Sequence, residues 1–255
     1  MIDVGAQSNS RASSSPQYLL LLLSAMVTLT ALVWVLWYCH FGLDVTDESY
    51  YLVWMSNPYK YSVSATQFGF LYHPLYEGLN GNIALLRQVN FLITFSLAWW
   101  LGNVFLNIVY SEKSINKIQR IIFSAAIAVT TATSLVFAGL WLPTPSYNSL
   151  AFQALLVAAI GLILTNREDV DFHSIVGALL IGIGGWLSFM AKPTSALALG
   201  LCTVFYFALS GKLRMKLIAI SVFVALSLVI VSALYIDGSI TAFINRLRGG
   251  AEMYR

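Results

Sequence analysis

Long, unbroken apolar runs determine what this chain can fold into. Hydrophobic residues make up 58% of its 255 residues and charged residues only 10%. A soluble domain of this size cannot bury so much apolar surface, whereas an apolar run of about 20 residues crosses a bilayer as a helix. We therefore predict an all-α protein, a polytopic transmembrane helical bundle of about seven spans. The predicted spans are 18–39, 91–110, 121–142, 149–165, 175–191, 195–209 and 217–236.

Two of these spans are less regular than the others. Span 195–209 is the shortest, so we expect it to be tilted, re-entrant, or extended by Pro193 and Thr194 as its first turn. Span 18–39 has a core too long for a cleaved signal peptide, so we interpret it as a helix of the bundle. We predict three segments: a disordered cytoplasmic leader (1–16), a seven-span module (17–236) and an extracytoplasmic tail (237–255). The first extracytoplasmic loop of the module is 40–90. The tail would be the start of a further loop if the chain is a fragment.

Lysine and arginine positions predict the orientation of the spans, because cytoplasmic loops carry an excess of these residues. With the N-terminus in the cytoplasm, the cytoplasmic segments hold eight cations, the outer loops between spans hold three, and the tail adds three more. We therefore expect an integral, multi-pass membrane protein with a cytoplasmic N-terminus. The cytoplasmic group is Arg11, Lys113, Lys117, Arg120, Arg167, Lys212, Arg214 and Lys216; the outer group is Lys60, Arg87 and Lys192, with Arg246, Arg248 and Arg255 in the tail.

Three carboxylates, Asp44, Asp47 and Glu48, stand in the first outer loop beside a pair of tyrosines. Ionisable groups at a membrane surface are candidates for function. The spacing of the aromatic residues predicts a short helix along the interface over 47–57, with acids in its first turn, where the helix dipole favours negative charge. Two interpretations follow: the acids cap this helix, or one of them acts as a general base beside the membrane.

Other classes of site find less support in the sequence. Cys39 and Cys202 fall toward opposite parts of the bilayer, so we expect no disulfide between them. No Cys/His spacing fits a structural zinc site. Gly182, Gly184 and Gly185 lie inside a span, where small residues allow close helix packing, and not in a phosphate-binding loop. The basic charge is too dispersed for nucleic acid to be an expected partner.

Three motifs in and after the first loop resemble those of a known family. An acid pair with aromatics, a His-Pro element and a Leu-Arg segment follow one another between the first two spans. This order resembles the membrane-embedded C-type (GT-C) glycosyltransferases, in particular the protein O-mannosyltransferase and aminoarabinose-transferase-like set with its bacterial lipopolysaccharide-modifying enzymes. The resemblance covers the N-terminal seven-span module of that family. The motifs are Asp47-Glu48-Ser49-Tyr50-Tyr51, His73-Pro74-Leu75 and Leu85-Leu86-Arg87-Gln88-Val89-Asn90.

The resemblance implies an activity and a location. Such enzymes move a sugar, with inversion, from a polyprenyl-phosphate donor to a lipid, glycan or protein acceptor at the extracytoplasmic face, here of the bacterial inner (plasma) membrane. Asp47 would be the base that deprotonates the acceptor hydroxyl. Glu48 would orient partners or reach the donor phosphate through a divalent cation, with His73 as a second metal ligand; some relatives use a cation and others need none. The implied substrate-binding residues are Asp44, Tyr50, Tyr51, His73, Arg87 and Lys192.

A departing phosphate needs fixed positive partners as its bond breaks. Lys192 directly precedes Pro193, so it stands beside a helix start whose N–H groups and dipole attract anions. Arg87 is a second candidate, because a guanidinium engages phosphate through two N–H bonds. Simpler roles stay open: Lys192 as an anchor that extends to the interface, and His73 as a hydrogen-bonding residue of the loop.

Two other classes of function remain as alternatives. A transporter of a small solute keeps ionisable residues near the bilayer midplane on broken helices, often in repeated halves, whereas the mid-span positions here are nearly free of charge. A non-catalytic membrane scaffold or assembly partner would not need the acids of the first loop. Enzymes of the family continue with further helices, so we expect this chain to be a fragment, to need a partner subunit, or to have lost activity. Membrane lipids are expected partners in every case.

Overall fold

The computed structural model describes residues 14–42, 47–110, 116–137, 143–165, 171–210 and 214–252. All regular secondary structure in these ranges is α-helical, as the sequence predicts, and they contain no strand. The helices are α1 (Ser14–Tyr38), α2 (Asp47–Ser56), α3 (Phe68–Gly78), α4 (Ile83–Val109), α5 (Lys117–Phe137), α6 (Tyr147–Leu164), α7 (Phe172–Ala191), α8 (Pro193–Leu209), α9 (Met215–Asp237) and α10 (Ile240–Glu252).

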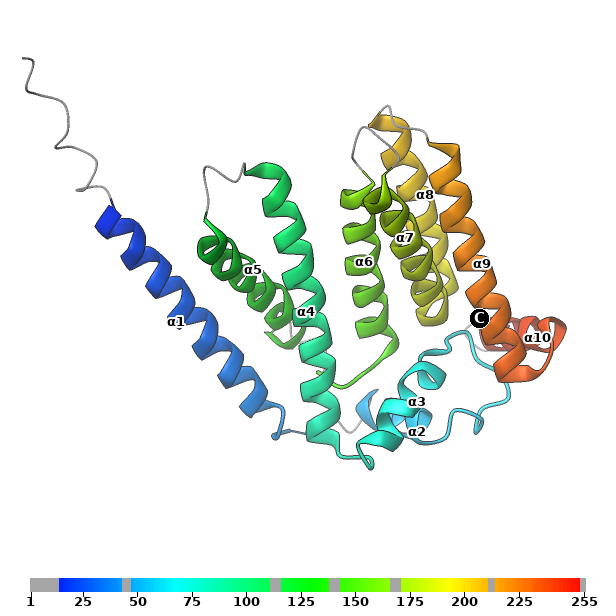
Figure 1. Cartoon of the computed structure of the whole chain (residues 1–255). Helices are drawn as coiled ribbons and strands as arrows, with labels where there is room; N and C mark the ends of the chain where they lie inside the picture. Colours follow the sequence, from blue (N-terminus) through cyan, green and yellow to red (C-terminus); the bar gives the residue numbers. More distant parts are fainter. Residues whose placement is uncertain are drawn as a thin grey trace, which may run out of the picture.

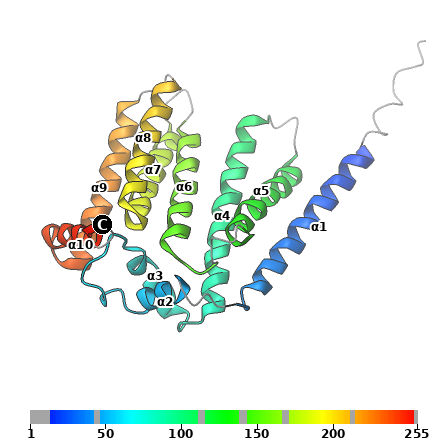
Figure 2. The same ribbon diagram turned by 180° about the vertical axis from the view of Figure 1, so that it is seen from behind.

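The longer helices, α1 and α4 to α9, run side by side, and the short helices α2, α3 and α10 lie together at one end of them (Figures 1 and 2). We call this end the capped end. Helix α7 packs against α6, α8 and α9, while α4 connects this group to α5, and α5 contacts α1. The capped end therefore brings the first loop close to the links between α5 and α6, between α7 and α8, and between α9 and α10.

In the described part of the chain, five helices are long and apolar enough to cross a membrane, which indicates an integral membrane protein. They are Tyr18–Tyr38 within α1, Ile83–Val109, Tyr147–Leu164, Phe172–Ala191 and Met215–Asp237. The described residues of the other two predicted spans also lie in helices, and 138–142 fall outside the described residues. Helix α8 is apolar but has only 17 residues, and α5 carries Lys117 and Arg120 in its first turn. Pro193 does form the first turn of α8, with Lys192 as the residue that precedes it.

Glycines that lie directly against backbone explain the tight contact between α6 and α7. A Cβ atom added to Gly161 would lie 2.6 Å from the carbonyl oxygen of Gly177, and one added to Gly184 would lie 2.9 Å from that of Ala154. Gly182 approaches α9 in the same way, 2.6 Å from the oxygen of Ser221. The predicted role of small residues in close helix packing is thus confirmed for Gly182 and Gly184, on two sides of α7, whereas Gly185 makes no close contact.

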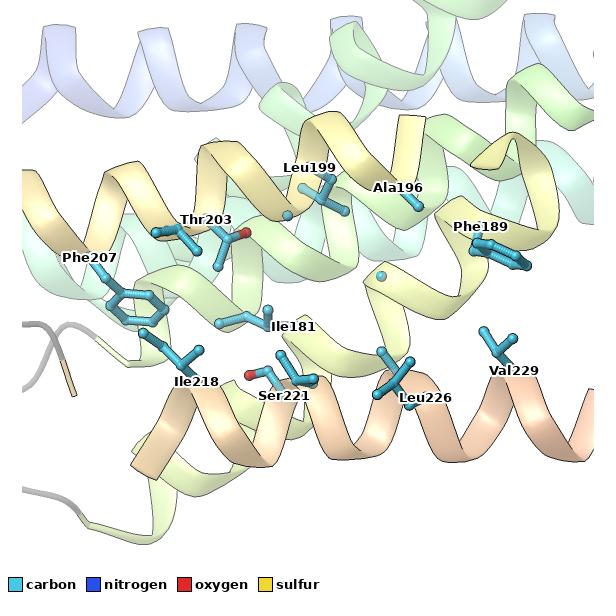
Figure 3. A pocket seen from close by; sticks show the side chains of 15 residues that line it. Ile181, Phe189, Ala196, Leu199, Thr203, Phe207, Ile218, Ser221, Leu226 and Val229 are labelled. Carbon is cyan, nitrogen blue, oxygen red and sulfur yellow. The ribbon is translucent and has the colours of Figure 1, made fainter. Parts of the chain in front are cut away.

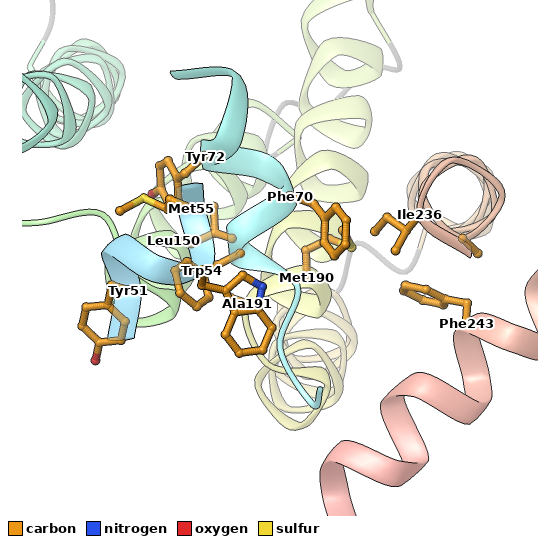
Figure 4. Close-up of a cluster of buried hydrophobic side chains, with 12 residues drawn as sticks. Tyr51, Trp54, Met55, Phe70, Tyr72, Leu150, Met190, Ala191, Ile236 and Phe243 are labelled. Atoms are coloured by element: carbon orange, nitrogen blue, oxygen red, sulfur yellow. The ribbon is translucent and has the colours of Figure 1, made fainter. Parts of the chain in front are cut away.

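An aromatic core fills the capped end. Tyr51, Trp54 and Met55 form the buried face of α2, at the helical spacing that the sequence indicates. Figure 4 shows how these side chains gather with residues of α3 around the ends of α7 and α9. Many aromatic rings of the first loop lie inside the protein, because α2 and α3 stack on the bundle. The buried members are Tyr51, Trp54, Met55, Phe68, Phe70, Tyr72, Leu150, Met190, Ala191, Ala233, Ile236 and Phe243.

Helix α10 is bound to the first loop. This contact is not predicted from the sequence, from which we expect only an extracytoplasmic tail over 237–255. Arg246 pairs with Asp237 through Nη2 and Oδ1 at 2.7 Å and donates from Nη1 to the carbonyl oxygen of Tyr61. The backbone N–H of Ser64 donates to the carbonyl oxygen of Arg246 at 3.1 Å. A Cβ at Gly250 would lie 2.1 Å from loop backbone, so only glycine fits there. These contacts fix α10 against the capped end.

Candidate functional site

Asp47, in the first turn of α2, is an exposed carboxylate at the capped end. The hydroxyl of Tyr51, one turn further along the helix, donates to Asp47 Oδ2 at 3.5 Å. Burial, helped by the neighbouring Tyr147 and Asp47, raises the pKa of Tyr51, so this hydroxyl stays protonated and remains a donor. Asp47 is therefore held by a weak contact on one side and open to solvent on the other, as a base that meets an external hydroxyl must be.

The neighbouring acid, Glu48, has a different environment. Its side chain is fully buried and forms a bidentate pair with Arg87, with Nη2 at 2.6 and 2.7 Å from the two carboxylate oxygens. Arg87 Nε donates to the same carboxylate at 2.8 Å, and the hydroxyl of Thr144 also donates to Glu48. Both charges are thus desolvated and paired, an arrangement in which removal of one partner leaves the other uncompensated.

Arg87 also ties the end of α1 to the start of α4. Its Nη1 donates to the carbonyl oxygens of Cys39 and Phe41, and its Nη2 donates to that of Gly42. All three guanidinium nitrogens are therefore engaged within the chain. The sequence suggests Arg87 as a phosphate ligand, but this geometry gives it the role of holding α2 and the end of α1 in place.

Lys192 is the residue between α7 and α8, at the capped end. Its Nζ donates to Asn148 Oδ1 at 2.9 Å and stands 4.3 Å from the centre of the Tyr147 ring. Burial lowers the pKa of Lys192. The Tyr147 ring in turn meets that of Tyr51 edge to face, with centroids 5.7 Å apart. Two tyrosines thus connect the candidate base at Asp47 with the candidate phosphate partner at Lys192.

A cavity of about 560 Å³ opens beside Lys192, and we call it the cation cavity. One wall is the start of α8, whose positive dipole end favours an anion. The opposite wall is α10, where Arg248 is largely exposed and donates from Nε to Glu252. Two cations and an apolar wall suit a ligand that has both an anionic group and a hydrophobic part. The lining residues are Ala65, Thr66, Tyr147, Phe189, Lys192, Pro193, Thr194, Ile244, Leu247, Arg248 and Ala251.

The buried pair leaves Glu48 without a free carboxylate oxygen for a cation, because both oxygens accept from Arg87. Within the described ranges, no group of three or more His, Cys, Asp or Glu residues gathers in one place. Nδ1 of His73 lies 2.7 Å from the carbonyl oxygen of Met55, so this side chain connects α3 to α2. A role of His73 as a metal ligand through its other nitrogen stays a prediction.

The remaining predicted site residues have packing partners or fall outside the described ranges. Tyr50 contacts the rings of Tyr51, Trp54 and Tyr61, with centroids 5.3 to 6.2 Å apart, so it belongs to the aromatic core. Asp44 lies outside the described residues. A direct contact of either residue with substrate stays a prediction.

A buried polar network supports the capped end from below. The amide of Gln153 donates to Asn90 Oδ1 at 2.9 Å and to Thr94 Oγ1 at 3.0 Å, and its oxygen accepts from the hydroxyl of Tyr72 at 2.9 Å. Asn90 donates in turn to the carbonyl oxygen of Pro143 at 2.9 Å. Every bond links two different elements, so the network fixes α3 to α4 and α6, where an unpaired amide would be costly.

Sequence reasoning missed Tyr147 and Arg248, which line the cation cavity, and Asn148, which accepts from Lys192. Ser146 caps α6, with its Oγ accepting from the Ser149 N–H. The side-chain oxygen of Asn148, near the start of the same helix, accepts from Lys192. The sequence could have indicated these residues only through the predicted topology, which places them on the same side of the membrane as Lys192.

Comparisons of the chain with protein-family models, with curated proteins and with solved structures find no match.

Proposed function

We propose that this chain is the membrane module of a glycosyltransferase that takes a sugar from a polyprenyl-phosphate donor. The observation that carries the proposal is the placement of an exposed carboxylate, Asp47, at the same end of the bundle as a cavity lined by Lys192 and Arg248. Tyr51 and Tyr147 stand between them. This pairing of a base with an anion site, at the edge of a membrane bundle, is what transfer from a lipid phosphate requires.

The proposed reaction is a single displacement. Asp47 accepts the proton of an acceptor hydroxyl while the hydroxyl oxygen attacks the anomeric carbon of the sugar. A new carbon–oxygen bond forms as the bond from that carbon to the phosphate oxygen breaks, and the electron pair leaves with the phosphate. Lys192 and the first turn of α8 stabilise the negative charge on the departing group. Attack from the side opposite the phosphate inverts the configuration.

Glu48 and Arg87 are positioning residues in this scheme. Their buried pair holds the first turn of α2, and therefore Asp47, against the start of α4. No step passes through a divalent cation, because the carboxylate of Glu48 is already engaged by Arg87 and Thr144.

The proposal includes a topology. In it α5 and α8 also cross the membrane, which gives seven spans with a cytoplasmic N-terminus, and the capped end faces outward from a bacterial inner membrane. The gathering of the first loop, the α5–α6 and α7–α8 links and α10 at one end supports this arrangement (Figure 1). A lipid-linked donor presents its cleavable bond at that level, where a headgroup meets water.

The test is sugar transfer in vesicles that contain the chain, a polyprenyl-phosphate sugar and an acceptor lipid. Asp47→Asn should reduce transfer by about 10²–10⁴-fold, the usual contribution of a general base. Glu77→Gln is the matched control, since Glu77 is an exposed carboxylate of α3 at the capped end. Transfer that persists in Asp47→Asn would remove the base. No transfer by the unaltered chain, with the vesicles otherwise competent, would favour a scaffold role.

A further inference from the structure

An apolar groove runs between α8 and α9 along one side of α7, and we call it the chain groove. It encloses about 270 Å³. Figure 3 shows α8 and α9 as its two walls, with Phe207 and Ile218 at one end and Phe189, Ala196 and Val229 at the other. Its lining is almost entirely carbon, with hydroxyls only at Thr203 and Ser221 among the lining residues. One of these, Ser221, donates to the carbonyl oxygen of Ala178 at 2.9 Å.

Small residues keep the chain groove open. Gly200 forms part of the α8 wall, and a Cβ added there would meet no atom within 4 Å. On the floor, a Cβ added to Gly185 would reach only the Ala225 side chain at 3.7 Å, an ordinary contact. Both α8 and α9 pack on α7, and the space between them is the groove. Since α7 and α9 are membrane spans, this space faces hydrocarbon and not water.

The chain groove begins where the cation cavity ends. Phe189 lines both spaces, and Ala196 of the groove follows Pro193 and Thr194 of the cavity by less than one helical turn. A ligand can therefore lie across both, with an anionic group near Lys192 and a hydrocarbon body between α8 and α9. The charge of the cavity and the apolar lining of the groove match the two halves of a lipid phosphate.

We propose that the chain groove holds the hydrocarbon chain of a polyprenyl phosphate whose phosphate lies in the cation cavity. The groove that shares Phe189 with the cavity is a channel between two helices, which fits a single hydrocarbon chain, as a polyprenyl phosphate has, whereas a diacyl phospholipid must place two. The identity of the lipid in this assignment rests on the proposed function. The binding of the lipid in the groove does not require Asp47.

The experiment measures lipid that stays bound to the purified chain, by native mass spectrometry after delipidation. Three probes are offered separately: a long-chain polyprenyl phosphate, the neutral polyprenol of the same length, and phosphatidylglycerol. Gly200→Phe fills the groove from its open side, while Ala198→Phe places the same ring on an exposed position of α8 outside the groove. We expect the unaltered chain to retain the polyprenyl phosphate in preference to both other probes.

Gly200→Phe should weaken this retention by about tenfold or more, because several methylene groups lose their contacts, and Ala198→Phe should leave it unchanged. Equal retention in Gly200→Phe and the unaltered chain would overturn the groove assignment. The assignment would also be overturned if phosphatidylglycerol bound the unaltered chain as well as polyprenyl phosphate does and Gly200→Phe weakened the binding of both to the same extent. Asp47→Asn should keep the lipid, so lipid binding without any effect of Asp47→Asn on transfer would defeat the catalytic proposal and leave the groove standing.

A second measurement covers the case in which Gly200→Phe does not fold. A photoreactive benzoylphenylalanine at Leu226, which lines the groove on α9, should crosslink the polyprenyl phosphate. The same residue at Phe223, which is exposed on α9 outside the groove, is the control for random contact with lipid. Crosslinking that is no stronger at Leu226 than at Phe223 would overturn the assignment.

Discussion

Lys192 lies over the ring of Tyr147, with Nζ 4.3 Å from the ring centre, and donates to the amide oxygen of Asn148, the next residue in the chain. This contact joins the start of α8 to the start of α6 although 44 residues separate the donor from its acceptor. It also directs the cation toward the cavity. A lysine that only anchored the helix at the interface would extend away from the bundle.

Replacing Lys192 should therefore weaken the binding of a lipid phosphate. Lys192→Gln keeps much of the side-chain length and a hydrogen bond to Asn148 but removes the positive charge. We expect polyprenyl-phosphate binding to weaken by about 10- to 100-fold, the usual value of a hydrogen bond to a charged group. The measurement is lipid retention by the purified chain. Lys60→Gln, which removes an exposed charge of the first loop, is the control and should have little effect.

The same contact predicts how binding depends on pH. Burial lowers the pKa of Lys192, and only its protonated form attracts phosphate. Binding should be full below this pKa and weaken as pH rises through it, at a lower pH than an exposed lysine would show. Lys192→Arg keeps its charge, so its binding should stay constant over the same range. An identical decline in Lys192→Arg would show that a group other than Lys192 is responsible.

Much of the fold follows from local sequence patterns. Nearly all described residues of the predicted spans lie in helices, because a long apolar run indicates a helix without reference to the rest of the chain. The short helix at Asp47–Ser56 and the start of α8 at Pro193 follow from aromatic spacing and from the preference of proline for the first turn. The predicted start of the second span, residue 91, is too late, because polar residues such as Arg87 conceal the helix that begins at Ile83.

The site was harder to predict because its contacts are long-range. The sequence places Glu48 and Arg87 in one loop, but their pairing across 39 residues depends on how α2 stacks on α4. Helix α10 forms the second wall of the cavity because Arg246 donates to the carbonyl oxygen of Tyr61, a bond between residues 185 positions apart. Periodicity and composition carry no information about such partners. Sequence reasoning could place these residues on one side of the membrane, and no closer.

The buried pair of Glu48 and Arg87 should be essential to stability. Glu48→Gln leaves the buried guanidinium without its counter-charge, and we expect a loss of about 3–5 kcal/mol in the free energy of unfolding. The double variant Glu48→Leu with Arg87→Met removes both charges and should be more stable than Glu48→Gln alone. Unfolding in mild detergent with added sodium dodecyl sulfate measures both. Arg248→Gln is the control: it breaks the exposed pair of Arg248 with Glu252 on α10 and should cost about 0.5 kcal/mol or less.

Loosening α10 should open the cation cavity without unfolding the bundle. Arg246→Gln breaks the pair with Asp237 and the bond to the Tyr61 carbonyl, so α10 loses its main polar attachment. Hydrogen exchange should rise in α10 and at Ser64, whose N–H donates to this helix, while exchange in α6 and α7 stays slow. Asn245→Ala, an exposed change on the same helix, is the control.

Because Leu247 and Arg248 of α10 line the cavity, the same Arg246→Gln variant should also bind polyprenyl phosphate more weakly. The two readouts separate the possible causes. Faster exchange with unchanged lipid binding would show that α10 is not a wall of the occupied site, and that Lys192 and the start of α8 hold the phosphate by themselves. Slow exchange in Arg246→Gln would instead mean that apolar contacts such as those of the buried Phe243 are sufficient to hold α10.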